Sequence, residues 1–206
     1  YVSVKVKNNN LIKPKKRVVL TYKLKKPVVL VGMMGAGKTA IGKSLSALLS
    51  VNFIDLDEEI SEAANMSISE IFSTYGEQFF RDKETKVLNR ILNKTSIILA
   101  TGGGILTQPK NQDIIFAKSH SIFLHSDCKL LWERIKNGKN RPLLNDCECY
   151  GDFEQLYRKR ETAYKKADIV VFNDKNYSIN EMAKITVNKY YSFLTAIRES
   201  NIDEKC

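Results

Sequence analysis

The segment from Gly32 to Thr39 constrains the fold of this chain more than any other. It reads Gly-Met-Met-Gly-Ala-Gly-Lys-Thr, which matches the pattern G-x-x-x-x-G-K-[ST]. An apolar, β-branched run at 28–31 precedes it, and a helical pattern at 38–49 follows. In such a strand–loop–helix unit, backbone N–H groups and the helix N-terminus close around phosphate oxygens. The sequence therefore predicts an ATP- or GTP-binding loop, with Lys38 on the β- and γ-phosphates and Thr39 on Mg²⁺.

Apolar runs alternate with helical patterns along the rest of the chain. The pattern predicts strands at 28–31, 53–56, 96–100, 121–125 and 169–172, and helices at 38–49, 58–64, 69–73, 77–92, 128–137, 153–167 and 179–197. Strands separated by helices form parallel βαβ units, so we expect a three-layer α/β/α fold with a five-stranded parallel sheet. Ligands of such sheets bind at the carboxyl ends of the strands.

The positive charge of the chain is concentrated at its N-terminus. The formal net charge is +10, and residues 1–26 hold nine Lys or Arg and no acidic residue, which leaves +1 for the remainder. We therefore predict a basic N-terminal arm over 1–26 and a single domain over 27–206. A solvated arm is the ordinary meaning of such a run, and contact with nucleic acid or acidic lipid is the alternative. We expect no nucleic-acid partner.

Composition favours a cytoplasmic protein. Apolar residues make up 43% and charged residues 27% of the chain, and no apolar run approaches the ~20 residues of a membrane span. The N-terminus lacks the apolar stretch of a signal peptide. The four cysteines form no C-x-x-C pair, so we expect free thiols: Cys128, Cys147, Cys149 and Cys206. No second exposed apolar pattern stands out, which favours a monomer.

Two carboxylates follow the second predicted strand. Asp55 and Asp57 are separated by one residue, and alternate residues of an extended segment point the same way. One carboxylate can help to hold hydrated Mg²⁺ while the other meets an acceptor hydroxyl group. The alternative is an ordinary acidic helix N-terminus, since Glu58 and Glu59 follow.

Further candidates lie after the third strand and in a helix before it. Gly102–Gly104 would let a ligand approach the backbone closely, and a flexible turn is the alternative. The guanidinium of Arg81 suits a carboxylate, and Glu84 at i+3 can orient it. Taken singly, that pair is more often an ion pair on a helix surface.

In combination, these motifs resemble the shikimate kinase family from about Pro27 to Asp168 and beyond. Six motifs occur in the order of that family: the phosphate loop, Asp55-x-Asp57, Gly76-Glu77-x-x-Phe80-Arg81-x-x-Glu84, Gly102-Gly103-Gly104, Arg141-Pro142-Leu143-Leu144 and Arg160-x-x-x-Tyr164. One such motif is weak, whereas six in order are specific.

The resemblance implies ATP-dependent phosphorylation of the 3-hydroxyl of shikimate to shikimate 3-phosphate, a step of aromatic amino-acid biosynthesis, with Mg²⁺ as cofactor. The implied nucleotide-binding residues are Gly35, Ala36, Gly37, Lys38, Thr39, Ala40, Arg134 and Arg141. The implied shikimate-binding residues are Asp57, Arg81, Gly103 and Arg160. The metal partners would be Thr39 and Asp55, the latter through water, and the catalytic residues Lys38, Asp57 and Arg141.

The resemblance also implies a fold of the P-loop kinase type and a mobile lid at about 138–153, which Arg141 opens, and which would exclude water when closed. Whether Asp57 acts as a general base or only orients the hydroxyl stays open. The residues that enclose adenine near 174–178 are not identified, and Tyr177 is a guess. Ala40 stands where many members of that family carry a second hydroxyl residue.

Three other functions compete with this one. A gluconate-type kinase would keep the phosphate loop but should lack the paired arginines combined with Gly102–Gly104. A nucleoside monophosphate kinase would need a base-binding pocket, for which the sequence gives no signal. A non-catalytic nucleotide-binding module that uses the basic arm for a partner would be expected to have lost at least one catalytic residue.

Overall fold

The computed structural model describes residues 24–136, 147 and 149–203. Its strands are β1 (Val28–Val31), β2 (Asn52–Asp55), β3 (Ile97–Ala100), β4 (His120–Ser126) and β5 (Ile169–Asn173). They form one parallel sheet in the order β2-β3-β1-β4-β5, in which Val29 of β1 lies between Leu99 of β3 and Ser121 of β4. The predicted five-stranded parallel sheet is confirmed, and the phosphate loop follows its central strand.

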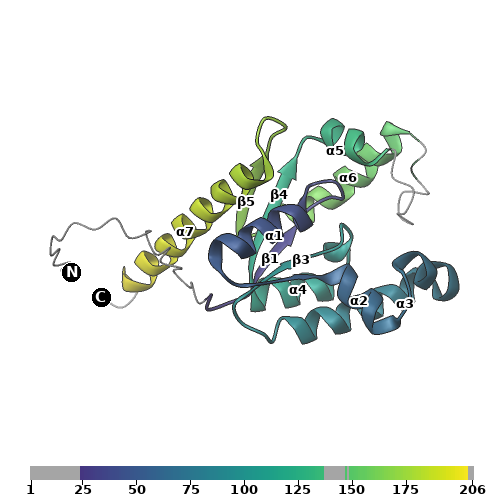
Figure 1. Cartoon of the computed structure of the whole chain (residues 1–206), viewed down its shortest axis with the longest axis horizontal. Helices are drawn as coiled ribbons and strands as arrows, with labels where there is room; N and C mark the ends of the chain where they lie inside the picture. Colours follow the sequence, from purple (N-terminus) through teal and green to yellow (C-terminus); the bar gives the residue numbers. More distant parts are fainter. Residues whose placement is uncertain (1–23, 137–146, 148, 204–206) are drawn as a thin grey trace, which may run out of the picture.

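Helices cover the sheet on both faces. They are α1 (Lys38–Leu49), α2 (Leu56–Ala64), α3 (Ile68–Ile91), the short 3₁₀ helix η1 (Ile105–Thr107), α4 (Pro109–Lys118), α5 (Cys128–Ile135), α6 (Tyr150–Tyr164) and α7 (Ile179–Asp203). Helix α1 packs against α7, while α3 packs against α4 (Figure 1). Right-handed crossovers put these two pairs on opposite faces of the sheet, which gives the three layers.

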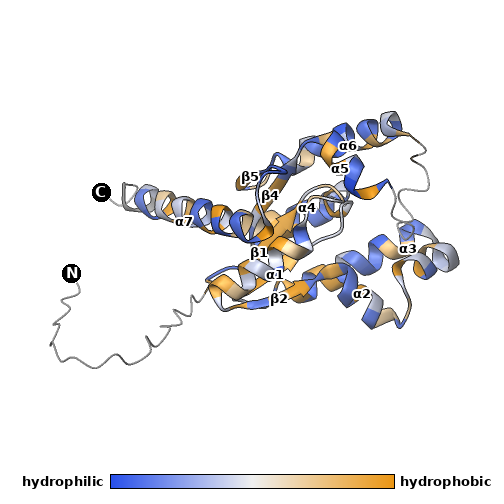
Figure 2. Cartoon of the chain, turned by 45° about the horizontal axis from the view of Figure 1, so that its top comes forward, coloured by the Kyte–Doolittle hydropathy of each residue, from blue (hydrophilic) through white to orange (hydrophobic). Residues whose placement is uncertain are grey.

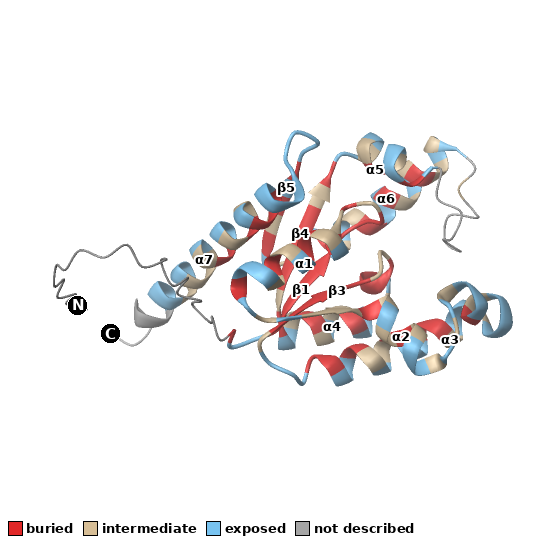
Figure 3. Ribbon diagram, in the orientation of Figure 1, coloured by how far each residue is buried: buried red, intermediate tan, exposed pale blue. Residues whose placement is uncertain are grey.

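The strands carry the core. Every residue of β1 and β3 is buried, as expected for parallel strands covered on both faces (Figure 3). Figure 2 shows the same strands as the most hydrophobic part of the molecule, with hydrophilic residues on the outer surfaces of the helices. Leu24 and Pro27, which precede β1, are buried as well. Among the described residues, no helix is long and apolar enough to cross a membrane.

The sequence missed or misplaced some elements. It did not predict η1 and α4, because the buried residues of 105–118 are too few and too unevenly spaced to show a helical period. Leu56 was assigned to the second strand but begins α2. The helices expected at 69–73 and 77–92 are confirmed as the two parts of α3, which meet at a kink where Gly76 takes φ 79°. Helix α6 begins at Tyr150, inside the expected lid.

Two predicted segments fall largely outside the described residues. The structure describes only 24–26 of the predicted arm, and it describes neither 137–146 nor residue 148 of the region around the predicted lid. Arg141, which the resemblance makes catalytic, therefore lies outside the described residues.

Candidate active site

The phosphate loop joins β1 to α1. Gly37 caps α1 with φ 83°, a left-handed conformation that glycine adopts without a Cβ penalty. Lys38, the first residue of α1, is buried, and its Nζ donates hydrogen bonds to the C=O groups of Gly32 (2.7 Å) and Met33 (2.9 Å). The lysine ammonium is thus held in the hollow of the loop, where phosphate oxygens would meet it.

Asp55 is the last residue of β2, and its side chain contacts the start of α1 and the start of α2. Its Oδ2 accepts a hydrogen bond from Thr39 Oγ1 at 2.7 Å, and its Oδ1 accepts one from the backbone N–H of Asp57 at 3.1 Å. Asp57 therefore lies in the first turn of α2 and not on the strand. The prediction that strand alternation aligns the two carboxylates was wrong, because Asp55 caps the helix that carries Asp57.

Arg81 is buried within α3, with 3% of its side chain exposed. Its Nη1 donates to Glu84 Oε2 at 3.0 Å, while Nε and Nη2 donate to Glu77 Oε1 at 3.1 and 2.9 Å. The predicted orientation of Arg81 by Glu84 is confirmed. The alternative, an ion pair on the helix surface, is excluded because both side chains are buried. The side chains of Arg81 and Glu84 both face the interior from the same side of α3.

Glu84 belongs to the site, although no role of its own was predicted for it from the sequence. It lines the cleft beside the phosphate loop, its side chain is fully buried, and its Oε1 has no hydrogen-bond partner among the described residues. Burial raises the pKa of Glu84 to about 7, against the opposing attraction of Arg81, and the charge of Asp57 raises this pKa further. The only sequence signal was its i+3 spacing from Arg81, which says nothing about burial.

This raised pKa predicts a pH-dependent stability. The folded protein holds the Glu84 proton up to about pH 7, whereas the unfolded chain releases it near its ordinary value of 4.5. Stabilisation is therefore complete below pH 4.5 and is lost as pH rises through about 7. Compared with Glu84→Gln, the wild type should lose on the order of 2 kcal/mol of unfolding free energy between pH 4.5 and 8. Urea unfolding of both proteins across that range measures the difference, and a constant difference would contradict the prediction.

The three glycines after β3 pack against the charged groups of the cleft. A Cβ on Gly102 would lie 3.0 Å from Asp57 Oδ1, and a Cβ on Gly104 would lie 2.6 Å from Arg81 Nη2. A larger residue at Gly104 would therefore have to displace the Arg81 guanidinium group, and one at Gly102 would crowd the Asp57 carboxylate. Within the described part of the chain, the N–H groups of Gly103 and Gly104 have no hydrogen-bond acceptor, so they are available to a ligand.

Arg160 reaches the glycines from α6. It is 7% exposed, and its Nη1 lies 3.4 Å from the C=O of Gly103. The charges of Arg160 and Arg81 both lower the pKa of Glu84, so the two guanidinium groups lie near one buried carboxyl group. The predicted pair of arginines is therefore brought together, although 79 residues separate them in the sequence.

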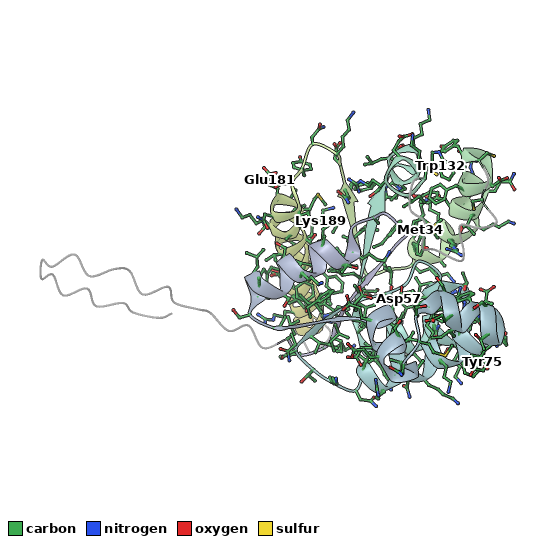
Figure 4. All side chains as sticks on the ribbon, turned by 45° about the vertical axis from the view of Figure 1, so that its right-hand side comes forward. Met34, Asp57, Tyr75, Trp132, Glu181 and Lys189 are labelled. Atoms are coloured by element: carbon green, nitrogen blue, oxygen red, sulfur yellow. The ribbon has the colours of Figure 1, made fainter. Side chains whose placement is uncertain are left out.

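One cleft of about 460 Å³ joins the phosphate loop to these acceptor-side groups. Its lining consists of Met34, Gly35, Gly37, Lys38, Thr39, Ala40, Asp55, Asp57, Ile68, Phe72, Phe80, Arg81, Glu84, Thr101, Gly102, Gly103 and Gly104. Figure 4 labels Met34 and Asp57, which lie toward the centre of the molecule, whereas Tyr75 lies at its outer edge. Arg160 lines a small pocket that adjoins the cleft at Gly103, and Ala36 is fully buried in the loop.

A second groove of about 630 Å³ lies between the start of α5 and the segment after β5. Arg134 of α5 donates from Nη1 to the C=O of Gly35 at 3.1 Å, and Asn173 donates to the C=O of Ala36 at 2.9 Å. Asn173 lines this groove and thus joins it to the phosphate loop, whereas Arg134 contacts the loop without lining the groove. Residues 173–176 line the groove, whereas Tyr177 does not and is half exposed, so adenine contact by Tyr177 stays a prediction.

The oxygen groups beside the phosphate loop fit Mg²⁺. The Thr39 hydroxyl and the Asp55 carboxylate are hard oxygen donors that lie 2.7 Å apart. No group of three or more His, Cys, Asp or Glu side chains suited to a metal occurs among the described residues. This sparse set suits an ion that keeps most of its ligands as water and phosphate oxygens.

Comparison with known proteins agrees with this geometry. A family model described as "Shikimate kinase" matches residues 34–190. A curated shikimate kinase of Ruegeria pomeroyi is 44% identical over 159 residues, which are 77% of this chain and 82% of that relative. Residues 34–190 include Lys38, Asp57, Arg81 and Arg160.

Solved structures give the same result. A structure of shikimate kinase from Acinetobacter baumannii in complex with shikimate superposes with a TM-score of 0.78 at 32% identity, over 81% of this chain and 93% of that one. A gluconokinase from Sinorhizobium meliloti shares the fold with a TM-score of 0.52 at 14% identity, over 90% of this chain and 100% of that one. The likeness to the gluconokinase shows the fold alone.

Proposed function

Because the chain belongs to the shikimate kinase family, we infer that it transfers the γ-phosphoryl group of ATP to the 3-hydroxyl group of shikimate. The products are shikimate 3-phosphate and ADP, and the reaction is a step of aromatic amino-acid biosynthesis. The observation that carries this conclusion is the single cleft in which Lys38 of the phosphate loop and Arg81 of the acceptor side face the same space. We also propose that the enzyme works in the cytoplasm as a monomer.

The acceptor side is built for a hydroxylated carboxylic acid. We assign the carboxylate of shikimate to Arg81 and Arg160, because guanidinium groups bind carboxylates with paired hydrogen bonds. Asp57 and the backbone at Gly103 would then meet the ring hydroxyl groups. The available N–H groups at Gly103 and Gly104 and the Asp57 carboxylate beside Gly102 support this assignment.

The transfer itself needs positioning and charge neutralisation more than covalent help. In the proposed reaction the 3-hydroxyl oxygen forms a bond to the γ-phosphorus as the bond from that phosphorus to ADP breaks. Asp57 orients the hydroxyl group or accepts its proton, and Lys38 stabilises charge on the phosphoryl oxygens. Arg134 would stack on adenine. We give Arg141 a second charge-stabilising role on the resemblance alone.

Thr39 and Asp55 are the residues that we propose hold Mg²⁺, Asp55 through water. The hydrogen bond between their side chains supports this assignment, because it keeps both oxygens at the mouth of the phosphate loop. When bound, the ion would neutralise part of the negative charge of the phosphate groups.

An assay of ADP release tests the acceptor. Shikimate, gluconate, CMP and AMP are offered in parallel with ATP and Mg²⁺, and turnover is expected with shikimate alone. ATP binding without shikimate-dependent turnover would favour the non-catalytic module, and turnover with gluconate would favour the related kinase.

We propose further that residues 27–206 form one kinase domain with a lid at about 138–153, and that the basic arm takes no part in catalysis. Leu24 is buried against the core and its C=O accepts a hydrogen bond from Ser96 Oγ, so the arm is best cut before Leu24. Deletion of residues 1–23 should leave kcat and both Michaelis constants within about twofold of wild type. A loss of activity beyond tenfold would show that the arm contributes to the site.

A further inference from the structure

Tyr164 contacts both halves of the site, although phosphoryl transfer gives it no task. It is the last residue of α6, one turn after Arg160, and its side chain is fully buried with its ring 5.2 Å from that of Phe123. A buried phenol needs a hydrogen-bond partner. The Tyr164 hydroxyl donates a hydrogen bond to the C=O of Gly103 and lies 3.8 Å from Sδ of Met33.

The C=O of Gly103 is held by two donors of α6. The Tyr164 hydroxyl donates one hydrogen bond to it, and Arg160 Nη1 lies 3.4 Å from the same oxygen. Because the peptide unit is planar and trans, fixing this C=O also fixes the direction of the N–H of Gly104. That N–H is one of the donors left available at the cleft. The hydroxyl of Tyr164 therefore sets the orientation of a substrate-facing peptide.

Gly103 packs closely against the phosphate loop and Arg160. A Cβ on this residue would lie 3.1 Å from the backbone N of Met34 and 3.8 Å from Arg160 Nη1. On the phosphate side, Met33 holds the Lys38 ammonium through its C=O. A shift of Gly103 would thus disturb Arg160 first, since the backbone of the phosphate loop has its own hydrogen bonds.

We propose that Tyr164 is a positioning residue for the acceptor, whose hydroxyl holds Gly103 and Arg160 in the arrangement that binds the carboxylate and ring hydroxyls of shikimate. The proposal rests on the function inferred above. Burial raises the pKa of Tyr164 to about 12, so its hydroxyl stays a protonated donor throughout the neutral range.

Tyr164→Phe tests the proposal, since it removes the hydroxyl and keeps the packing of the ring. One hydrogen bond of about 1–1.5 kcal/mol corresponds to a rise of roughly 5- to 10-fold in the Michaelis constant for shikimate. The Michaelis constant for ATP should stay within about twofold, because the phosphate loop keeps its own contacts. A merely structural role would lower the melting temperature without separating the two substrates.

Tyr157→Phe is the matched control. Tyr157 is a second buried tyrosine of α6, and its hydroxyl lies 3.4 Å from Glu161 Oε1 and not at Gly103. This variant should keep the wild-type Michaelis constant for shikimate. Isothermal titration of shikimate into each folded variant, with melting curves alongside, gives a second measure of the same effect.

The outcomes are distinct. An unchanged Michaelis constant for shikimate in Tyr164→Phe overturns the proposal, as does an equal rise for shikimate and ATP. An effect of similar size in Tyr157→Phe also overturns it. If the wild type does not phosphorylate shikimate, the assigned function fails and takes this proposal with it; if it does, only the role of Tyr164 is at stake.

Discussion

Lys38→Met is expected to lower kcat by about 10²- to 10³-fold while leaving the protein folded. The lysine is the buried cation of the phosphate loop, with its ammonium 2.7 Å from the C=O of Gly32. Methionine fills the space of the aliphatic stem but supplies no charge to the phosphoryl group. ADP release at saturating ATP and shikimate measures kcat, and a melting curve checks the fold.

Lys43→Met is the control for that loss. Lys43 lies on the same helix, is exposed, and rests 5.7 Å from the centre of the Phe53 ring, away from the phosphate loop. Its substitution should leave kcat within about twofold of wild type. A Lys38→Met enzyme that keeps more than a tenth of wild-type kcat would contradict the role given to Lys38.

Arg81→Lys is expected to lower kcat/KM for shikimate by about 10²-fold, mainly through a higher Michaelis constant. Lysine keeps the positive charge beside the buried Glu84, so the carboxyl group is not left without a compensating charge. It loses the planar fork that can bind a carboxylate with two hydrogen bonds. Steady-state kinetics with shikimate varied at saturating ATP measure the change.

Two further variants separate this effect from general damage to α3. Arg90→Lys changes an exposed arginine of the same helix, paired with Glu59, and should have no effect on either substrate. Gly104→Ala places a Cβ 2.6 Å from Arg81 Nη2, so it should displace the guanidinium group and also raise the Michaelis constant for shikimate. An unchanged constant in Arg81→Lys would remove Arg81 from the acceptor site.

Much of the fold followed from local patterns. The central strand with its phosphate loop, the five strands and most helices were predicted, because apolar periodicity and glycine positions depend on neighbouring residues only. The strand order β2-β3-β1-β4-β5 was not predicted, nor was α4. Strand order depends on how the crossovers close over the sheet, which no local pattern encodes.

Most of the residues that line the cleft were also named from the sequence, whereas their contacts and burial were not predicted. Asp55 and Asp57 were expected to align by strand alternation, but a helix cap aligns them. Arg81 and Glu84 were expected to pair, but nothing in their spacing indicated that both would be buried. Burial is the main cause of the raised pKa of Glu84, and the charge of Asp57 adds to it.

The sequence by itself determined that the stretch from Gly32 to Thr39 binds phosphate, since loop, lysine and helix start are contiguous in the chain. The tertiary structure alone decided what shares a cleft with that loop. The parallel sheet places the end of β3, and with it Gly103, beside the phosphate loop, and α6 brings Arg160 and Tyr164 against the same carbonyl group. Those contacts join residues 57 and 61 positions apart, so they exist only once the sheet has formed and its helices have packed.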